Sequence, residues 1–237
     1  MNSRIFSRPV GLFAVGAFAA ATLVAGAGGG PVSFGAHFHG HRYSGGNWGG
    51  YVSFGSFSTA TAGWTEPSVS CNSSNDLFAP WVGIDGDGSS SVEQTGVATD
   101  CSSGSAVYQA WYEMYPAAPV YYTTSEAPVS AGDHLTATVT RSGDNYRLDL
   151  TNDTQGWTKT TNQTLNAPHS SAEAIIESPT DSYPAINGGV SFDGVKFDGK
   201  NLGDTSPQAL NADDGGSATW TPGAIGGDGQ SFTMTRQ

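Results

Sequence analysis

The sequence predicts an all-β protein built as a sandwich of two antiparallel sheets. From Asn47 onward, apolar and polar residues alternate with a period of two, and no stretch has convincing helical periodicity. Thirty-three glycines, together with abundant Ser and Thr, supply turns and solvated faces. So many short strands in one domain favour stacked sheets, because stacking buries one face of each strand without crossover helices.

Residues 1–27 are typical of a secretory signal peptide. Arg4 and Arg8 give a positive start, residues 10–24 form an apolar run, and residues 25–27 (AGA) form a small-residue cleavage site. The run is short for a bilayer span, although a retained anchor would share these features. We therefore expect a secreted, extracellular protein with no membrane association after cleavage.

Residues 28–46 are rich in glycine and aperiodic, and we interpret them as a propeptide or a flexible N-terminal segment. They include His37, His39 and His41. Alternating histidines can hold a metal, but no acidic residue or cysteine lies nearby, so we expect no metal and no other cofactor. Residues 47–237 have the size of a single domain and contain no internal repeat.

The candidate strands of this domain are alternating runs, each bounded by turn residues. In chain order they are residues 50–54, 78–84, 92–97, 106–115, 134–141, 146–151, 157–164, 173–177, 189–192 and 231–235.

The charge balance limits the possible partners. Nine Lys and Arg stand against 21 Asp and Glu, a formal net charge of -12 that becomes -14 without Arg4 and Arg8. This balance argues against nucleic acids and anionic membranes. Few fixed positive charges also limit self-repulsion once carboxylates are protonated, which suits an acidic environment, although general solubility would explain the acidity equally well.

Several hydrolase signatures are missing. The sequence has no G-x-S-x-G elbow, no H-E-x-x-H zinc motif and no Asp-Thr-Gly or Asp-Ser-Gly pair. Asp85-Gly86-Asp87-Gly88 resembles a calcium loop but lacks the further acidic ligands, so we interpret it as a turn. Cys71 and Cys101 are the only cysteines; in an exported chain we expect them to form a disulfide, which leaves no thiol nucleophile.

Five segments, in order, resemble the glutamic peptidases (eqolisins), a family of secreted acid endopeptidases. They are NWGGYV (47–52), WVGIDGDG (81–88), EQTG (93–96), AWYEMYP (110–116) and AEAIIESP (172–179). The resemblance spans the predicted domain and implies a lectin-like (concanavalin A-like) sandwich that acts on protein or peptide substrates. It identifies Glu177 and Gln94 as the catalytic pair. We further expect a monomer.

One departure from the family concerns the residues after the glutamine. Family members often carry an acidic residue soon after it, whereas Ala98 and Thr99 stand there in this chain. The sequence therefore does not identify the residues that form hydrogen bonds with Gln94.

The strand pattern agrees with a substrate cleft on one face of a sheet. Alternation places Trp111, Glu113 and Tyr115 on one face, and likewise groups Trp81 with Asp85. We assign these five residues to substrate binding. Packing within the sandwich would explain them as well.

The pair supplies the two groups that amide hydrolysis needs. Glu177 can take a proton from water, and the amide of Gln94, which does not titrate, can stabilise the oxyanion. Glu173 shares the face of Glu177 and is the alternative choice of base. We assign Glu173 to the rim of the cleft.

Other functions remain open from the residues alone. A lectin-like sandwich presents aromatics and carboxylates to sugars as readily as to peptides, so a carbohydrate-binding domain is the alternative. A glycoside hydrolase that uses Glu113 and Glu177 is a variant of it. A structural adhesion domain would explain the composition but not the five ordered segments.

Overall fold

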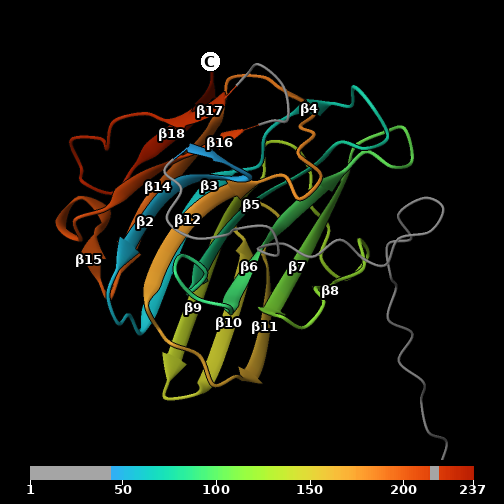
Figure 1. The fold of residues 1–237 in the computed structure, drawn as a ribbon. Helices are drawn as coiled ribbons and strands as arrows, with labels where there is room; N and C mark the ends of the chain where they lie inside the picture. The colour runs from blue at the N-terminus through green and yellow to red at the C-terminus, as the bar shows by residue number, and fades with distance from the viewer. Residues whose placement is uncertain (1–43, 214–218) are drawn as a thin grey trace, which may run out of the picture.

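A computed structural model describes residues 44–213 and 219–237 (Figure 1). The predicted signal peptide and residues 28–43 of the predicted N-terminal segment lie outside the described residues. The described part is almost entirely β-structure, with one short 3-10 helix, η1 (Leu202–Asp204). None of its helices is long and apolar enough to cross a membrane.

Most strands belong to two antiparallel sheets that share strand β16. We call them sheet A and sheet B. Sheet A runs in the order β11 (Trp157–Thr164), β10 (Asn145–Asn152), β9 (His134–Ser142), β3 (Thr59–Thr65), β14 (Val190–Phe197), β18 (Phe232–Arg236), β17 (Thr219–Pro222) and β16 (Gln208–Asp213). Sheet B continues from β16 through β2 (Trp48–Phe54), β12 (Ser171–Glu177), β5 (Leu77–Ile84), β6 (Val92–Asp100), β7 (Val107–Tyr115) and β8 (Val120–Tyr121).

Short strands complete the fold. β1 (Ser44–Gly46) pairs with β16 in parallel, and β15 (Lys200–Asn201) pairs with β14. β13 (Ala185–Ile186) and β4 (Val69–Ser70) form a separate two-stranded ribbon. Residues 44–46 of the predicted N-terminal segment are therefore already part of the folded domain.

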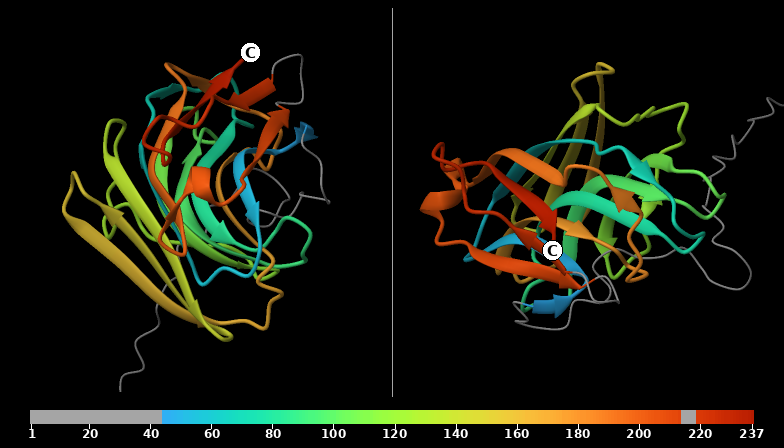
Figure 2. Two further views of the ribbon diagram at one scale, coloured as in Figure 1. Left: turned by 90° about the vertical axis from the view of Figure 1, so that its left-hand side faces the viewer. Right: turned by 90° about the horizontal axis from the view of Figure 1, so that it is seen from above.

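The two sheets pack face to face. β5 and β6 of sheet B lie against β3, β9 and β10 of sheet A. In the left view of Figure 2, the yellow strands β10 and β11 form a layer beside the green strands. The prediction of an all-β sandwich of two antiparallel sheets is confirmed.

The sandwich core lies between the sheets and uses one face of each strand of sheet B. Phe78, Val82, Val97 and Ile176 of sheet B join the apolar residues of sheet A there, all fully buried. The intervening residues form a second apolar cluster on the opposite face, which contains Trp48, Trp81 and Trp111. We call this opposite face the tryptophan face.

All ten predicted strands are present, with ends that shift by a few residues; the strand predicted at 157–164 has those bounds in the structure. Sequence analysis missed β3, which lies in the middle of sheet A. Its sequence, TATAGWT, buries mainly small residues, so its apolar periodicity is weak. It also missed β16 and β17, where the sheets join.

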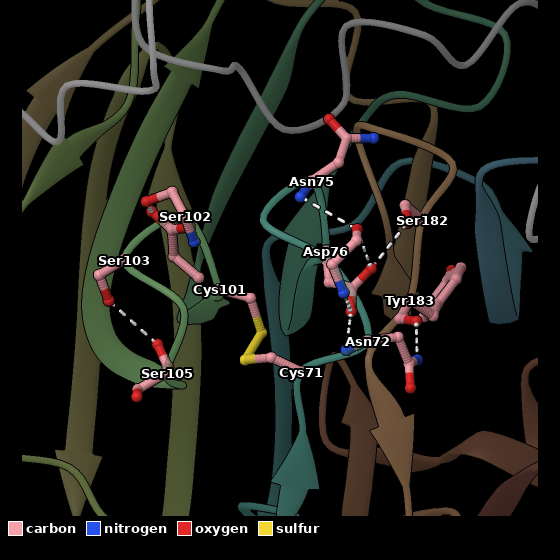
Figure 3. Close-up of a disulfide and its surroundings, with 12 residues drawn as sticks. Cys71, Asn72, Asn75, Asp76, Cys101, Ser102, Ser103, Ser105, Ser182 and Tyr183 are labelled. Carbon is pink, nitrogen blue, oxygen red and sulfur yellow. Dashed lines mark hydrogen bonds between the residues drawn. A yellow bond between two sulfur atoms is a disulfide. The ribbon is translucent and has the colours of Figure 1, made fainter.

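The predicted disulfide is present and ties β6 to the segment that leads into β5 (Figure 3). Cys71 and Cys101 have Cα atoms 5.6 Å apart. Beside the bridge, Asp76 accepts hydrogen bonds from the backbone N–H of Asn72 (2.6 Å) and from the Ser182 hydroxyl (2.8 Å). These contacts fix the start of β5, the strand that carries Trp81.

Candidate active site

The tryptophan face brings the two residues of the predicted catalytic pair onto the same side of sheet B. In an antiparallel sheet, directly opposed residues point to the same side. Ile175 opposes Trp81, and Glu177 opposes Ala79, on the β12–β5 pair. Gly83 opposes Gln94 on the β5–β6 pair. The register therefore places Glu177, Trp81 and Gln94 on one face.

Glu177 is the last residue of β12, and its buried carboxylate is held at both oxygens. Asn47 Nδ2 donates to Oε1 (2.9 Å), and Trp81 Nε1 donates to Oε2 (3.0 Å). The strand ends here because Pro179, two residues later, cannot donate to a ladder. The two N–H donors fix the orientation of the Glu177 carboxyl group.

Asn47 is itself anchored beside Glu177. Its carbonyl oxygen accepts hydrogen bonds from the backbone N–H of Ser178 (3.3 Å) and from the Tyr183 hydroxyl (3.4 Å). Hydrogen bonds to the Asn47 backbone therefore hold its side-chain amide in place beside the Glu177 carboxylate.

Gln94 lies in the third residue position of β6, with its side chain buried. Its cross-strand partner on β7 is Glu113, and Gln94 Nε2 donates to Glu113 Oε2 at 2.9 Å. The Gln94 amide is thus bound to a buried carboxylate of β7, the neighbour of β6 that lies farther from Glu177 in the strand order.

Trp81 lies between the two residues of the pair. Its indole N–H binds Glu177, while the other end of the ring lies over Gly83. A Cβ added to Gly83 would be 2.9 Å from Trp81 Cζ3 and 3.3 Å from Gln94 Cβ. Glycine at position 83 therefore leaves the space into which the indole fits beside Gln94. Trp48 packs edge-on against the same indole, with ring centroids 4.7 Å apart.

The remaining residues predicted to bind substrate occupy different places. Trp111 is fully buried on the tryptophan face, and Tyr115 packs against the same cluster at partial exposure. Asp85 follows the end of β5 with a φ of 68° and so leaves the strand alternation. Its carboxylate accepts hydrogen bonds from the backbone N–H groups of His169 (2.8 Å) and Ser170 (2.6 Å). Asp85 therefore holds the turn that precedes β12.

Glu173 does not lie at a rim, as the sequence analysis assigned it, but is fully buried. A Cβ on Gly83 would be 3.1 Å from Glu173 Oε1, which places this carboxyl near Gln94 on the tryptophan face. Burial raises the pKa of Glu173 well above its ordinary value. The Ser171 hydroxyl lowers this pKa, and the charges of Asp85, Asp87 and Glu93 raise it further. The misplacement arose because alternation reveals the face of a residue but not its depth.

Two residues of the site were missed. Asn47 lies in the NWGGYV segment, which could have drawn attention to it, but nothing in the sequence pairs it with Glu177. Tyr121 of β8 opposes Trp111 and packs against the tryptophan cluster. Burial, together with the charges of Glu113, Asp100 and Glu177, raises the pKa of the Tyr121 phenol, so its hydroxyl stays protonated.

Within residues 44–213 and 219–237, no group of three or more His, Cys, Asp or Glu side chains is arranged to hold a metal ion. His37, His39 and His41 lie outside the described residues. Chemically, the site offers an oriented carboxylate, a neutral amide and indole walls.

Comparisons with known proteins place the chain among relatives of known class. The family model described as the peptidase A4 family matches residues 46–221. Aspergillopepsin-2 of Aspergillus niger is 34% identical over 114 residues, which cover 39% of this chain and 40% of that protein. Scytalidopepsin B of Scytalidium lignicola is 41% identical over 100 residues, which cover 41% of this chain and 36% of that protein. Both alignments thus span less than half of these relatives.

A structural comparison extends over more of the chain. A scytalido-glutamic peptidase solved with a transition-state-analogue inhibitor superposes with a TM-score of 0.66 and 25% identity. The superposition covers 81% of this chain and 98% of that chain.

Proposed function

This chain belongs to the peptidase A4 family, and from that premise we propose that it is a secreted glutamic endopeptidase that hydrolyses peptide bonds at acidic pH. The observation that carries the proposal is the geometry of Glu177. Asn47 and Trp81 orient its carboxylate, and the same indole reaches to the side of Gln94. With a carboxylate and a neutral amide on either side of one indole, the carboxylate can take a proton from water, and the amide can stabilise the oxyanion that forms when water attacks a carbonyl.

Glu177 acts first as a general base. It takes a proton from a water molecule while the water oxygen bonds to the scissile carbonyl carbon, which gives a tetrahedral intermediate. The protonated Glu177 then donates this proton to the departing amine nitrogen as the C–N bond breaks. The products are a carboxylic acid and an amine, and Glu177 returns to its starting form. Because Glu177 must be ionised to begin, activity falls at the most acidic pH values.

Gln94 stabilises the negative charge that develops on the carbonyl oxygen. An amide NH₂ has two N–H groups, and the one that does not bind Glu113 is the donor we assign to the oxyanion. The amide carbonyl helps to orient the water. Since an amide does not titrate, Gln94 keeps these roles throughout the acidic range.

Targeting and maturation follow the sequence expectations. We propose cleavage of a signal peptide after residue 27 and removal of the following N-terminal segment before residue 44, because residues 44–46 form β1 of the folded domain. Support for the second step comes from Asn47, which binds Glu177 directly. The start of a mature chain would then lie at the catalytic base. Protein or peptide substrates are the proposed partners, and the proposed state is a monomer.

The decisive assay separates peptide from sugar chemistry. The purified protein is incubated at pH 3 to 4 with an acid-denatured protein and, in parallel, with polysaccharides. We expect new amino termini from the protein and no reducing sugar. Release of sugar without peptide cleavage would instead support the carbohydrate-active alternative. If no product forms but sugars bind, the protein is a carbohydrate-binding domain.

A further inference from the structure

We infer that Glu113 is a positioning residue for Gln94: it fixes the orientation of the Gln94 amide and does not itself bind substrate. This inference rests on the proposed function and deepens it. The direct observation is the hydrogen bond from Gln94 Nε2 to Glu113 Oε2, 2.9 Å long, between two fully buried side chains.

The fold forces this contact. Gln94 and Glu113 are directly opposed on the β6–β7 pair and therefore project from the tryptophan face side by side. On the other side of Gln94, the opposed residue of β5 is Gly83, which has no side chain to offer. Glu113 is thus the cross-strand neighbour that can hold the amide.

A glutamine amide needs such a neighbour because its two ends are similar in shape and opposite in function. Rotation by 180° exchanges the N–H₂ group and the carbonyl oxygen. Only one of the two orientations presents a donor to an oxyanion. Glu113 Oε2 accepts the hydrogen bond from Nε2, and this contact holds the amide in the orientation in which Nε2 faces Glu113.

A purely structural reading explains less. Burying a carboxylate is costly unless hydrogen bonds compensate it, so an apolar residue would pack this position at lower cost. The carboxylate at position 113 contributes a function that an apolar residue lacks, namely discrimination between the two ends of an amide. The same contact argues against Glu113 as a glycosidase acid, since its Oε2 is bound to Gln94.

The test is a double-mutant cycle on peptide hydrolysis at pH 3.5. Gln94→Ala is expected to lower kcat by about 100- to 1,000-fold, the usual effect of losing an oxyanion donor. Glu113→Ala should cause a loss of similar size with KM changed less than about threefold. Combined in one protein, the two changes should cost little more than either alone, because Glu113 acts through Gln94.

Glu113→Gln serves as the conservative variant. Its amide can pair with Gln94 in both orientations, so we expect kcat within about tenfold of the parent, a partial rescue relative to Glu113→Ala. This variant also keeps the side-chain volume, which maintains the test if the Glu113→Ala protein does not fold. Far-UV circular dichroism and urea denaturation report folding of each variant.

Glu93→Gln is the matched control. Glu93 is the neighbour of Gln94 on the same strand, is equally buried, and points to the opposite face of sheet B. Its replacement should leave kcat and KM within about threefold of the parent at pH 3.5.

Three outcomes would overturn the inference. One is a Glu113→Ala protein with a raised KM and an unchanged kcat, which would make Glu113 a substrate contact. Another is a pair of losses that multiply in the double variant, which would show independent roles. The third is a folded Glu113→Gln protein as inactive as Glu113→Ala, which would show that the carboxylate itself reacts. If Gln94→Ala and Glu177→Gln kept full activity, the proposed function would fail instead.

Discussion

At the scale of single residues, the site contains two carboxyl groups, Glu177 and Glu173, whose surroundings differ. Glu177 receives N–H donors at both oxygens, which hold its carboxyl group in one orientation. Glu173 lies on the same strand and face as Glu177, and burial raises its pKa. No hydrogen bond of normal geometry reaches its carboxylate oxygens within the part of the chain that the structure describes. This difference in environment is the reason why we propose Glu177, and not Glu173, as the base.

Replacement of Glu177 by glutamine should abolish turnover while leaving the fold intact. Glutamine keeps the shape and an acceptor oxygen for Trp81 or Asn47, but it cannot take a proton from water. We expect an initial rate on an unfolded protein at pH 3.5 at least about 100-fold below the parent rate. Circular dichroism checks folding, and Glu173→Gln is the comparison. A folded Glu177→Gln protein with more than about a tenth of the parent rate would exclude Glu177 as the base; an inactive Glu173→Gln protein would indicate Glu173 instead.

At the scale of elements, the close approach of β5 and β6 positions Trp81 beside Gln94. Gly96 of β6 opposes Trp81, and its missing side chain lets the two strands meet. A Cβ at this position would overlap the Pro80 carbonyl oxygen and would be 2.6 Å from Trp81 Cβ. The partner atoms belong to backbone and to a Cβ, so no rotamer change can relieve the overlap.

Gly96→Ala should consequently destabilise the protein by about 1–3 kcal/mol or more, as overpacking in a core does. The measurement is the free energy of unfolding from urea titration at pH 4. Gly227→Ala is the control, because a Cβ at that position would have no atom within 4 Å. We expect that variant to stay within about 0.5 kcal/mol of the parent. Equal stability of the two variants would contradict the described approach of β5 and β6.

The disulfide acts on the same two strands from their far ends. Cys71 and Cys101 are separated by 30 residues, and the closed loop contains all of β5 and β6. In the chain-entropy model a loop of this length stabilises the folded state by about 3–4 kcal/mol. The double variant Cys71→Ala, Cys101→Ala should lose about this much in urea denaturation at pH 4. A loss below about 1 kcal/mol would mean that the disulfide does not restrict the conformations of the unfolded chain.

At the scale of the whole molecule, several buried acids make the fold better suited to acid than to neutral pH. Burial, partly offset by hydrogen bonds from Trp64 and Thr99, raises the pKa of Glu66 to about 8. Burial and the charge of Asp85 raise the pKa of Glu93 to about 8. Glu93 lies on the sandwich-core face of β6, and Glu66, the residue after β3, accepts a hydrogen bond from Thr99 of that same face.

A surface histidine works in the same direction. His134 bonds Asp153 (2.8 Å) and Asp193 (3.1 Å), and its pKa is raised: partial burial alone would lower it, but these hydrogen bonds and charges outweigh that effect. Thr136 also donates to Asp153. A raised histidine pKa stabilises the fold below the unfolded value of about 6.5, and this contribution disappears as pH rises through the folded value.

Stability should therefore fall as pH rises from about 4.5 to about 8. Over this range the unfolded chain has released the protons of Glu66 and Glu93 while the folded protein still holds them, so each group lowers the free energy of unfolding by about 1.4 kcal/mol per pH unit at most. Urea midpoints at pH 4 and pH 7.5 measure the difference. Glu93→Gln should reduce it, because glutamine carries no proton to lose.

Glu126→Gln is the control for this prediction. Glu126 lies at the surface, where hydrogen bonds with Thr123 lower its pKa, so its replacement should leave the pH difference in place. Equal urea midpoints for the parent at pH 4 and pH 7.5 would contradict the assignment of Glu66 and Glu93 as protonated buried acids.

What the sequence determined by itself is the architecture, the disulfide and the strands that carry the proposed site residues. Period-two alternation predicted the strands that carry Trp81, Gln94 and Glu177, because alternation is a local property of a strand. Two isolated cysteines predicted the disulfide. Alternation was weakest where small residues form a strand, as in β3.

Only the tertiary structure decided which groups contact the pair. Asn47 lies 130 residues from Glu177 along the chain, and Trp81 lies 96 residues from it. Strand order and register bring them together, and neither is encoded in the alternation of a single strand. The depth of Glu173 and the departure of Asp85 from its strand were settled in the same way, since burial and hydrogen-bond partners depend on the other strands of the sheet and on the turn before β12.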